Sequence, residues 1–528
     1  MNLIRTKQTG WLLCLFLVYV SCAPKINPSK AMVNQVSATA SSSLSPLMIG
    51  MEANPLMRIR IYVPPGLADV KVNTIRCTIN ADAVNWVQAL QVYDRGIEPS
   101  FNPANKAHTF TPAASAFDIP VDLSFGPGLH YVWLGATLKE TADMDGIINF
   151  YVNELVSSSG NTINVSQENT SFKKRVGIAV RKAGDDNVHT YRIPGIMTTD
   201  KGTLISVYDI RYKHSGDLPA NIDVGMSRST DGGRTWQPMK IIMDMGAPHE
   251  NNGVGDPSVL FDPVTKKIWV AALWSKGNRS IAGSEPGLSP DTTGQFVLVS
   301  SDDDGLTWSQ PYSITSQVKD PNWHLYFNGP GNGIAMQDGT LVFPSQYWDE
   351  SKKPGIPHSS VIYSKDHGKT WQSGVGAKSN TTESQVVETT PGTLMLNMRD
   401  NRGKFRSVST TPDLGKTWVE HFTSYKALID PVCMASIIKA TVDADGNNKD
   451  ILFFSNVHSQ RGRFDMSIRA STDLGNSWPE SRVLLIDERE CYGYSCLTKI
   501  DDHTIGILYE GIRNLYFVRV PVKDILNP

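Results

Sequence analysis

Cysteine is scarce in this sequence, with 6 residues in a chain of 528. Beyond residue 22 only Cys77, Cys433, Cys491 and Cys496 remain. Four cysteines in a chain of this length exclude a disulfide scaffold, and none stands in a cluster with zinc-ligand spacing. Cys491 and Cys496 either pair across a turn or stay free. We expect neither a metal ion nor another cofactor.

The sequence also lacks an excess of charge of either sign, since its formal net charge is −2. Nothing in this balance indicates a nucleic-acid partner. By contrast, 42 glycines, 31 prolines and 12 tryptophans are typical of a turn-rich protein made of strands. The chain is long enough for two or three domains.

The first 22 residues have the pattern of an export signal. Arg5 and Lys7 precede a short apolar core at residues 11–20, which is too short to span a bilayer comfortably. Cys22 then follows a small residue, as at a bacterial lipoprotein site, although Tyr19 stands where Leu is usual. Either a lipid anchor at Cys22 or simple cleavage with release would place the protein outside the cytoplasm, in the periplasm, at the cell surface or in the medium.

One phrase occurs five times, with the pattern Ser/Thr-x-Asp-x-Gly-x-Thr/Ser-Trp. The copies occupy residues 229–236, 301–308, 364–371, 411–418 and 471–478. The Asp can accept hydrogen bonds within a turn, the Gly supplies a positive φ, and the Trp anchors the returning strand. Repeats of this length suit the blades of a β-propeller. Five copies and the remaining strands fit six blades, of which one lacks the phrase.

Domain organisation follows from where the phrase occurs. We expect a flexible tether at 23–46, a β-sandwich at 47–156, a linker at 157–174 and a six-bladed propeller at 175–528. The fold class is therefore all-β. The sandwich is either a carbohydrate-binding module or a packing domain. Trp86, Tyr93 and Trp133 could stack on a sugar or could equally belong to the core.

Three arginines outside the repeats lie in recognisable segments. Arg192 is in Tyr191-Arg-Ile-Pro194, Arg399 in Leu396-Asn-Met-Arg399, and Arg463 in Arg463-Phe-Asp-Met-Ser-Ile468. These segments and the five phrases resemble the bacterial exo-α-sialidases (neuraminidases), glycoside hydrolases with Asp-box, or BNR, repeats. The resemblance implies that the three arginines hold the carboxylate of sialic acid, a task that suits fork-shaped, always charged guanidinium groups.

Arg461 is an alternative to Arg463. We prefer Arg463 because it lies eight residues before Ser471, the spacing that the family has to the following box.

The resemblance also implies the reacting groups. Tyr494 matches the nucleophile and Glu383 its partner, with Tyr492 and Glu388 as alternatives. A neutral Tyr avoids the repulsion that a carboxylate nucleophile would meet from the substrate's own carboxylate, but it needs a base beside it. Asp217 matches the acid/base residue on a mobile loop, with Asp209 and Asp223 as alternatives.

Supporting roles are implied for three further residues. Asp256 would contact the amide or hydroxyl side of the sugar, Arg211 would reach the carboxylate or the O4 region, and Glu510 would hold the fork of Arg192. Residues 323–333 and 346–348 could line the glycerol or leaving-group side.

The resemblance implies a retaining exo-α-sialidase that hydrolyses terminal sialic acid from glycoproteins, glycolipids and oligosaccharides. A trans-sialidase or an anhydrosialidase would use the same residues. A propeller that only binds glycans would have no reason to keep the whole set. We expect a monomer with sialylated glycans as substrates.

Overall fold

The computed structural model describes residues 35–528 except 105, 107 and 169–171. The export signal and Cys22 lie outside the described residues. The helices that the structure describes are short: α1 (Ala81–Val84), α2 (Thr315–Val318), α3 (Val522–Leu526) and the 3-10 turns η1 (Asp185–Asn187), η2 (His249–Asn251) and η3 (Glu480–Arg482). None of them has the length and apolar character needed to cross a bilayer.

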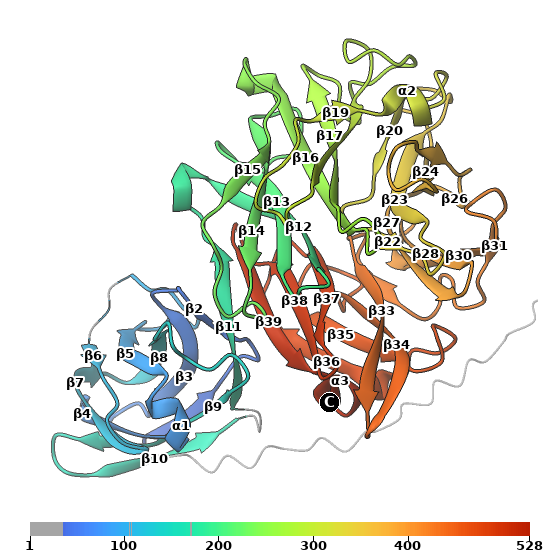
Figure 1. The fold of residues 1–528 in the computed structure, drawn as a ribbon. Coiled ribbons are helices and arrows are strands. Elements are labelled where there is room, and N and C mark those ends of the chain that lie inside the picture. The colour runs from blue at the N-terminus through green and yellow to red at the C-terminus, as the bar shows by residue number, and fades with distance from the viewer. Residues whose placement is uncertain (1–34, 105, 107, 169–171) are drawn as a thin grey trace, which may run out of the picture.

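The amino-terminal part is a β-sandwich, drawn in blue at the lower left of Figure 1. One sheet contains β1 (Ser37–Ser41), β3 (Asn54–Val63), β8 (Gly128–Leu138), β5 (Val87–Asp94) and β6 (His108–Phe110). The other contains β4 (Val70–Ile79), β7 (Ala116–Phe125), β9 (Ile147–Ser157) and β10 (Thr162–Gln167). Alternation builds its core: in β3, Ile59, Ile61 and Val63 point inward while Arg60 and Tyr62 face solvent.

The structure corrects two of the expected boundaries. Strand β1 lies inside the predicted tether and pairs with β3 and β10. Strand β10 lies inside the predicted linker and pairs with β9. The reason is that Ala38 and Ala40 are buried at alternate positions of β1. Such small side chains, in a stretch rich in Ser and Ala, give little hydrophobic signal although they do alternate.

The rest of the chain forms six mainly antiparallel blades of a propeller, the last of which is continuous with the sandwich sheet, and this confirms the fold class. Blade 1 holds β12 (Thr190–Thr198), β13 (Leu204–Arg211), β14 (Ile222–Ser229) and β15 (Lys240–Met243). Blade 2 holds β16 (Asn252–Phe261), β17 (Ile268–Lys276), β18 (Gln295–Ser301) and β19 (Tyr312–Ser313), with β21 (Gly331–Asn332) beside β16. Blade 3 holds β20 (Leu325–Asn328), β22 (Ile334–Ala335), β23 (Leu341–Trp348), β24 (Pro357–Ser364), β25 (Gln372–Ser373) and β26 (Lys378–Ser379).

For the remaining blades, as for the first three, the strands are named from the centre of the propeller outward. Blade 4 holds β27 (Thr381–Thr390), β28 (Thr393–Asp400), β30 (Ser407–Thr411) and β31 (Val419–Glu420), flanked by the pair β29 (Lys404–Phe405) and β32 (Ile429–Asp430). Blade 5 holds β33 (Ser436–Ala444), β34 (Asn447–Val457), β35 (Met466–Ser471) and β36 (Val483–Asp487). Blade 6 holds β37 (Ser495–Asp501), β38 (Thr504–Glu510), β39 (Leu515–Pro521) and β11 (Lys173–Arg181).

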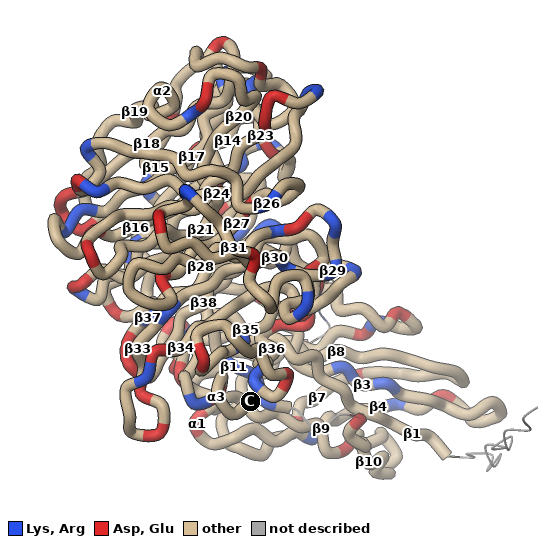
Figure 2. The backbone as a smooth tube through the Cα atoms, turned by 90° about the vertical axis from the view of Figure 1, so that its right-hand side faces the viewer, with Lys and Arg blue, Asp and Glu red and all other residues tan. Residues whose placement is uncertain are grey.

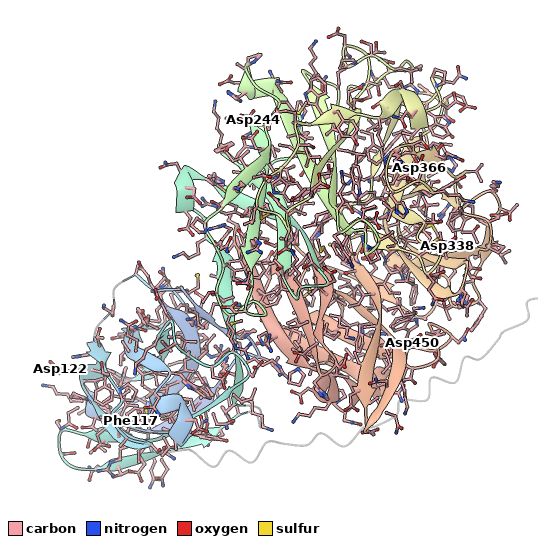
Figure 3. All side chains as sticks on the ribbon, in the orientation of Figure 1. Phe117, Asp122, Asp244, Asp338, Asp366 and Asp450 are labelled. Carbon is pink, nitrogen blue, oxygen red and sulfur yellow. The ribbon has the colours of Figure 1, made fainter. Side chains whose placement is uncertain are left out.

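Each copy of the repeated phrase is the turn between the third and fourth strands of blades 1 to 5, and blade 6 has none. In the fourth copy, Asp413 accepts hydrogen bonds from the backbone N–H and the hydroxyl of Thr417 at 2.9 and 2.7 Å. These bonds lower the pKa of Asp413 to about 2. Gly415 has a φ of +82°, as the pattern requires. The third copy has the same geometry, and Figure 3 labels its Asp366.

Strand β11 joins the two parts of the molecule. It precedes blade 1 in the chain yet pairs with β39 of blade 6, so it closes the ring. The same strand pairs with β9 of the sandwich and with β2 (Leu47–Ile49). Figure 1 shows the sandwich lying against this last blade, beside β11 and β39. The two parts therefore share one continuous sheet.

The aromatic residues considered for sugar stacking belong to the packing of the sandwich. Tyr93 and Trp133 are 2% and 9% exposed, and Phe101 packs edge-on against both. The ring of Trp86 fills the space beside Gly146. The four cysteines of the described chain are free and buried, so the predicted alternative of a Cys491–Cys496 disulfide is wrong.

Candidate active site

The inner strands of the blades begin at a cavity of about 270 Å³ in the centre of one propeller face. Residues from blades 1 to 5 and from the segment that leads into blade 6 line it: Arg192, Ile193, Asp217, Leu218, Asp256, Leu273, Ser280, Ile281, Phe327, Gln346, Trp348, Thr382, Glu383, Arg399, Asn401, Arg463 and Tyr494. The structure thus brings together the three predicted arginines, the Tyr, the Glu and both predicted Asp residues. They come from positions up to 302 residues apart in the sequence, between Arg192 and Tyr494.

Irregularities of the inner strands aim several of these side chains. The register shifts between Arg192 and Gly195 in β12, and between Gly255 and Ser258 in β16. Ile193 and Asp256 at these shifts have φ values of +55° and +57°. A β-branched residue in the left-handed region is strained, and such strain concentrates at functional sites. A bulge of this kind turns a side chain out of the regular alternation and toward the ligand.

A buried carboxylate holds Arg192. Glu510 is fully buried and accepts from Nε and Nη2 of Arg192 at 3.0 and 3.4 Å. It also accepts from the backbone N–H groups of Ile193 and Tyr494 at 2.9 and 3.0 Å. One carboxylate therefore fixes the fork of the arginine, the strained bulge beside it and the backbone of Tyr494.

Tyr494, Glu383 and Arg399 form one connected group. The Tyr494 hydroxyl donates to Glu383 at 2.5 Å, and Nη1 of Arg399 donates to the same hydroxyl at 3.0 Å and also to Glu383. Burial, and next the charge of Glu383, raise the pKa of Tyr494 well above its ordinary value. The phenol is consequently protonated at neutral pH, and Glu383 is placed to receive its proton.

Arg463 completes the cationic surroundings of the phenol. Its guanidinium lies 5.7 Å from the centre of the Tyr494 ring, and that of Arg192 lies 5.3 Å from it. Nη1 of Arg463 donates to the carbonyl of Tyr492 at 2.7 Å, which orients the side chain. Arg461 is exposed and does not line the cavity.

Asp217 lies at the mouth of the cavity, with 77% of its side chain exposed. Arg211 donates to it at 2.6 Å, and Arg192 lies 3.5 Å away. Shielding from water by the cavity walls acts to raise the pKa of Asp217, but the guanidinium groups of Arg211 and Arg192 outweigh it and lower the pKa below its ordinary value. Without a ligand, Asp217 is thus held in its charged form.

Asp209 and Asp256 lie deeper beside the same arginine. Asp209 accepts from Nε and Nη2 of Arg211 at 3.1 and 2.8 Å and from the backbone N–H of Asp256 at 2.8 Å. Burial, and next the charges of Asp209, Glu383 and Asp217, raise the pKa of Asp256 well above its ordinary value. A protonated Asp256 can offer an O–H donor to a ligand.

The remaining alternatives lie outside the cavity. Glu388 accepts the backbone N–H groups of Gln337 and Gly392, both at 2.8 Å, and so supports a turn. Tyr492 packs under Arg192, with 4.9 Å between the guanidinium carbon and the ring centre. Asp223 accepts from the hydroxyl of Tyr212 at 2.9 Å, and burial raises its pKa to about 6.

Sequence reasoning found only part of the apolar side of the cavity. Leu218, Leu273, Phe327 and Trp348 pack together there, and Ile281 joins them from the loop between β17 and β18. Phe327, Gln346 and Trp348 fall in the aromatic loops that were considered, whereas Trp323 and Tyr347 stack on each other at 3.8 Å and do not line the cavity. Proximity to predicted site residues could have predicted three further lining residues. Leu218 follows Asp217, Thr382 precedes Glu383, and Asn401 lies two residues after Arg399. Leu273 and Ile281 carry no such signal.

The fold and the cavity together define a class of protein. Its members are closed six-bladed propellers with a cluster of arginines around a Tyr–Glu pair. Comparison with known proteins agrees. A family profile described as "BNR repeat-like domain" matches residues 213–508. The sialidase of Bacteroides fragilis is 46% identical over 415 residues, covering 77% of this chain and 76% of its own length. The sialidase of Clostridium perfringens is 30% identical over 393 residues, covering 68% of this chain and 99% of its own.

A solved structure extends the likeness to the amino-terminal sandwich. The Hadza microbial sialidase Hz136 is 40% identical and superposes with a TM-score of 0.86, over 92% of this chain and 99% of its own. The chain belongs to the sialidase family of BNR-repeat proteins.

Proposed function

We propose that the protein is an exo-α-sialidase that removes terminal sialic acid from glycoconjugates with retention of configuration, using Tyr494 as nucleophile. The observation that carries this is the geometry of the cavity. Arg192, Arg399 and Arg463 lie around the side chain of Tyr494, whose hydroxyl is bonded to Glu383. The volume of about 270 Å³ suits one sugar ring.

Substrate binding would use the positive charge of the arginines. The carboxylate on the anomeric carbon of sialic acid is planar, so guanidinium forks can hold it in a fixed orientation. Glu510 keeps the fork of Arg192 in place through its two bonds to that arginine. Arg211 would support the same side of the sugar. Asp256, neutral because of its raised pKa, would donate a hydrogen bond to a hydroxyl or amide oxygen.

The first chemical step would form a bond from the Tyr494 oxygen to the anomeric carbon as the bond to the leaving oxygen breaks. The phenol proton passes to Glu383, 2.5 Å away, and Asp217 gives a proton to the leaving oxygen. The neighbouring guanidinium groups stabilise the negative charge that develops on the phenol oxygen. A carboxylate nucleophile would be repelled by the substrate's own carboxylate, which a neutral Tyr avoids.

The second step would reverse these roles. Asp217 accepts a proton from a water molecule, the water oxygen bonds to the anomeric carbon, and the Tyr494 oxygen leaves and recovers its proton from Glu383. Two displacements at one carbon give net retention of configuration.

Release of the fluorophore from a fluorogenic sialoside by the purified protein tests the proposal, and no release would overturn it. Since a trans-sialidase or anhydrosialidase would use the same residues, the products should be analysed with and without added lactose. Free sialic acid with retained configuration is expected in both cases. Sialyllactose or an anhydro sugar as the main product would contradict hydrolysis.

Export is a separate proposal that rests on the first 22 residues of the sequence. Arg5, Lys7 and the apolar core that follows support a signal peptide. Cys22 would carry a lipid if the lipoprotein alternative holds. We also propose that the protein acts as a monomer.

A further inference from the structure

A second hollow of about 490 Å³ lies on blade 4, beside the catalytic cavity. Its walls are formed by the loop after β31 and by the ends of β26 and β28. Its lining includes the charged and aromatic side chains of Lys378, Arg402, Phe422, Tyr425 and Lys426.

The hollow and the cavity are neighbours through two consecutive residues. Asn401 lines the catalytic cavity, and Arg402 lines the hollow. Arg402 is fixed in place because Nη1 donates to Asp400 at 3.0 and 3.1 Å and Nη2 donates to the carbonyl of Ser379 at 3.0 Å. A ligand that extends from the cavity across Asn401 would therefore meet a guanidinium group that is already oriented.

The charge of this part of the surface is positive. Within the hollow, Arg402 is offset by the buried Asp400, and Lys378 by Glu420 at 2.7 Å. Lys426 forms no direct ion pair among the described residues, although, after the hydrogen bond from Lys378, its charge also lowers the pKa of Glu420. Lys404 and Arg461 nearby form none either. The side-chain amide of Gln460 donates to the carbonyl of Lys404 at 3.2 Å. This bond holds the loops that carry Lys404 and Arg461 next to each other. Figure 2 shows Lys and Arg on the loops around β29 and β30, with Asp and Glu segments beside them. Such a surface attracts an acidic ligand.

Aromatic side chains provide the other half of a sugar-binding surface. Phe422 is 63% exposed, and the ring of Tyr425 packs edge-on against Phe405 at 5.8 Å with Lys378 5.9 Å from its centre. Tyr425 has a φ of +56°, a costly conformation for a bulky residue. Aromatic rings beside a fixed guanidinium suit a sugar that carries a carboxylate or sulfate, because the apolar C–H face stacks while the acid group pairs.

We propose that this hollow binds an acidic sugar residue of the same glycan whose terminal sialic acid occupies the catalytic cavity. The inference rests on the proposed function and deepens it. It assigns the enzyme a preference for glycans in which a second acidic sugar lies close to the one removed.

The test compares kcat/KM on α2,8-linked disialyllactose, sulfated sialyllactose, monosialyllactose and an aryl sialoside. The wild type is compared with Lys426→Glu and Phe422→Ala, two exposed positions whose replacement leaves the core intact. Lys201→Glu is the matched control, since it makes the same change of charge in the turn between β12 and β13, at the end of β12 far from Arg192.

We expect both variants to lose about three- to tenfold in kcat/KM on the disialyl substrate, the size of one solvent-exposed polar contact for Lys426 and of one aromatic contact for Phe422, with little change on monosialyllactose or the aryl sialoside. A parallel loss on the sulfated substrate would identify a general acid-group site, and a loss on the disialyl substrate alone a carboxylate site. Equal effects on all substrates, or a loss in Lys201→Glu as large as in Lys426→Glu, would overturn this inference and leave the proposed function standing. A wild type that does not hydrolyse the aryl sialoside would overturn both.

Discussion

At the scale of single residues, the cavity separates charge into two zones. Glu383 and Tyr494 lie on one side with Arg399 between them, and Asp217 lies at the mouth between Arg192 and Arg211. The first zone keeps a phenol protonated next to its base. The second keeps a carboxyl group charged until a ligand competes for the arginines. Without a ligand, both pKa shifts oppose the proposed first step, in which Tyr494 loses a proton and Asp217 donates one, so a bound substrate has to reverse them.

Removing the hydroxyl of Tyr494 tests the nucleophile. In Tyr494→Phe we expect kcat to fall at least about a thousandfold on an aryl sialoside, since no other group can form the covalent intermediate. Tyr492→Phe keeps the ring under Arg192 and should retain activity within about twofold. Steady-state kinetics measure both. Full activity in Tyr494→Phe would remove it from this role.

The pH dependence of catalysis tests Asp217. In the free enzyme its pKa lies below the ordinary value, so the fraction that is protonated decreases as pH rises above that low pKa. A bound carboxylate would neutralise Arg192 and add negative charge, and both effects raise the pKa of Asp217. We therefore expect the alkaline limb of the kcat profile to lie at higher pH than that of kcat/KM. Coincident limbs would contradict the role of Asp217, and Asp217→Asn should abolish the limb.

At the scale of the elements, turns and bulges have different roles. The repeated turns fix the outer strands, while irregularities in the inner strands present the functional side chains. Local signals made the turns predictable, because Asp, Gly and Trp each act within a few residues of themselves. The bulges were not predictable, because the strain at Ile193 is held by Glu510, which is 317 residues away in the sequence.

One turn also carries a tertiary contact, which a substitution can test. Gly233 has a φ of +87°, and a Cβ there would come within 2.1 Å of the Phe517 ring in β39. Gly446 has a φ of +79° with nothing within 4 Å of the added Cβ. Both Gly→Ala changes strain the backbone, but only Gly233→Ala adds overpacking, which costs about 1–3 kcal/mol. Urea unfolding should show the larger loss for Gly233→Ala, and equal losses would contradict the contact.

At the scale of the whole molecule, the sandwich and the propeller share one sheet and several side-chain and backbone contacts. They share β11, and Asp145 of the sandwich accepts from Nε of the nearly buried Arg519 at 2.7 Å and from Arg234. Glu488, in the loop that leads to Tyr494, donates its backbone N–H to the carbonyl of Leu44 at 2.9 Å. The sandwich therefore supports the loop of the proposed nucleophile.

Thermal and urea unfolding test this coupling. We expect a single transition for the whole chain, because opening either part breaks a strand that the other needs. Asp145→Ala should lower the free energy of unfolding by about 1–2 kcal/mol, since it leaves Arg519 without its carboxylate while Asp145 itself is partly exposed. Asp122→Ala, at the exposed position labelled in Figure 3, is the control and should change little. Two separate transitions would contradict a shared unit.

The amino-acid sequence by itself determined the blades and predicted most of the charged residues that line the cavity. The turn phrase acts locally, and the arginine, Tyr and Asp segments keep a recognisable order along the chain. Only the tertiary structure decided which side chains meet. It placed Arg463 in the cavity and left Arg461 outside, and it set Glu388 in a supporting turn. It also made β1 and β10 part of the sandwich. These outcomes depend on pairing and burial between distant segments, which no local pattern records.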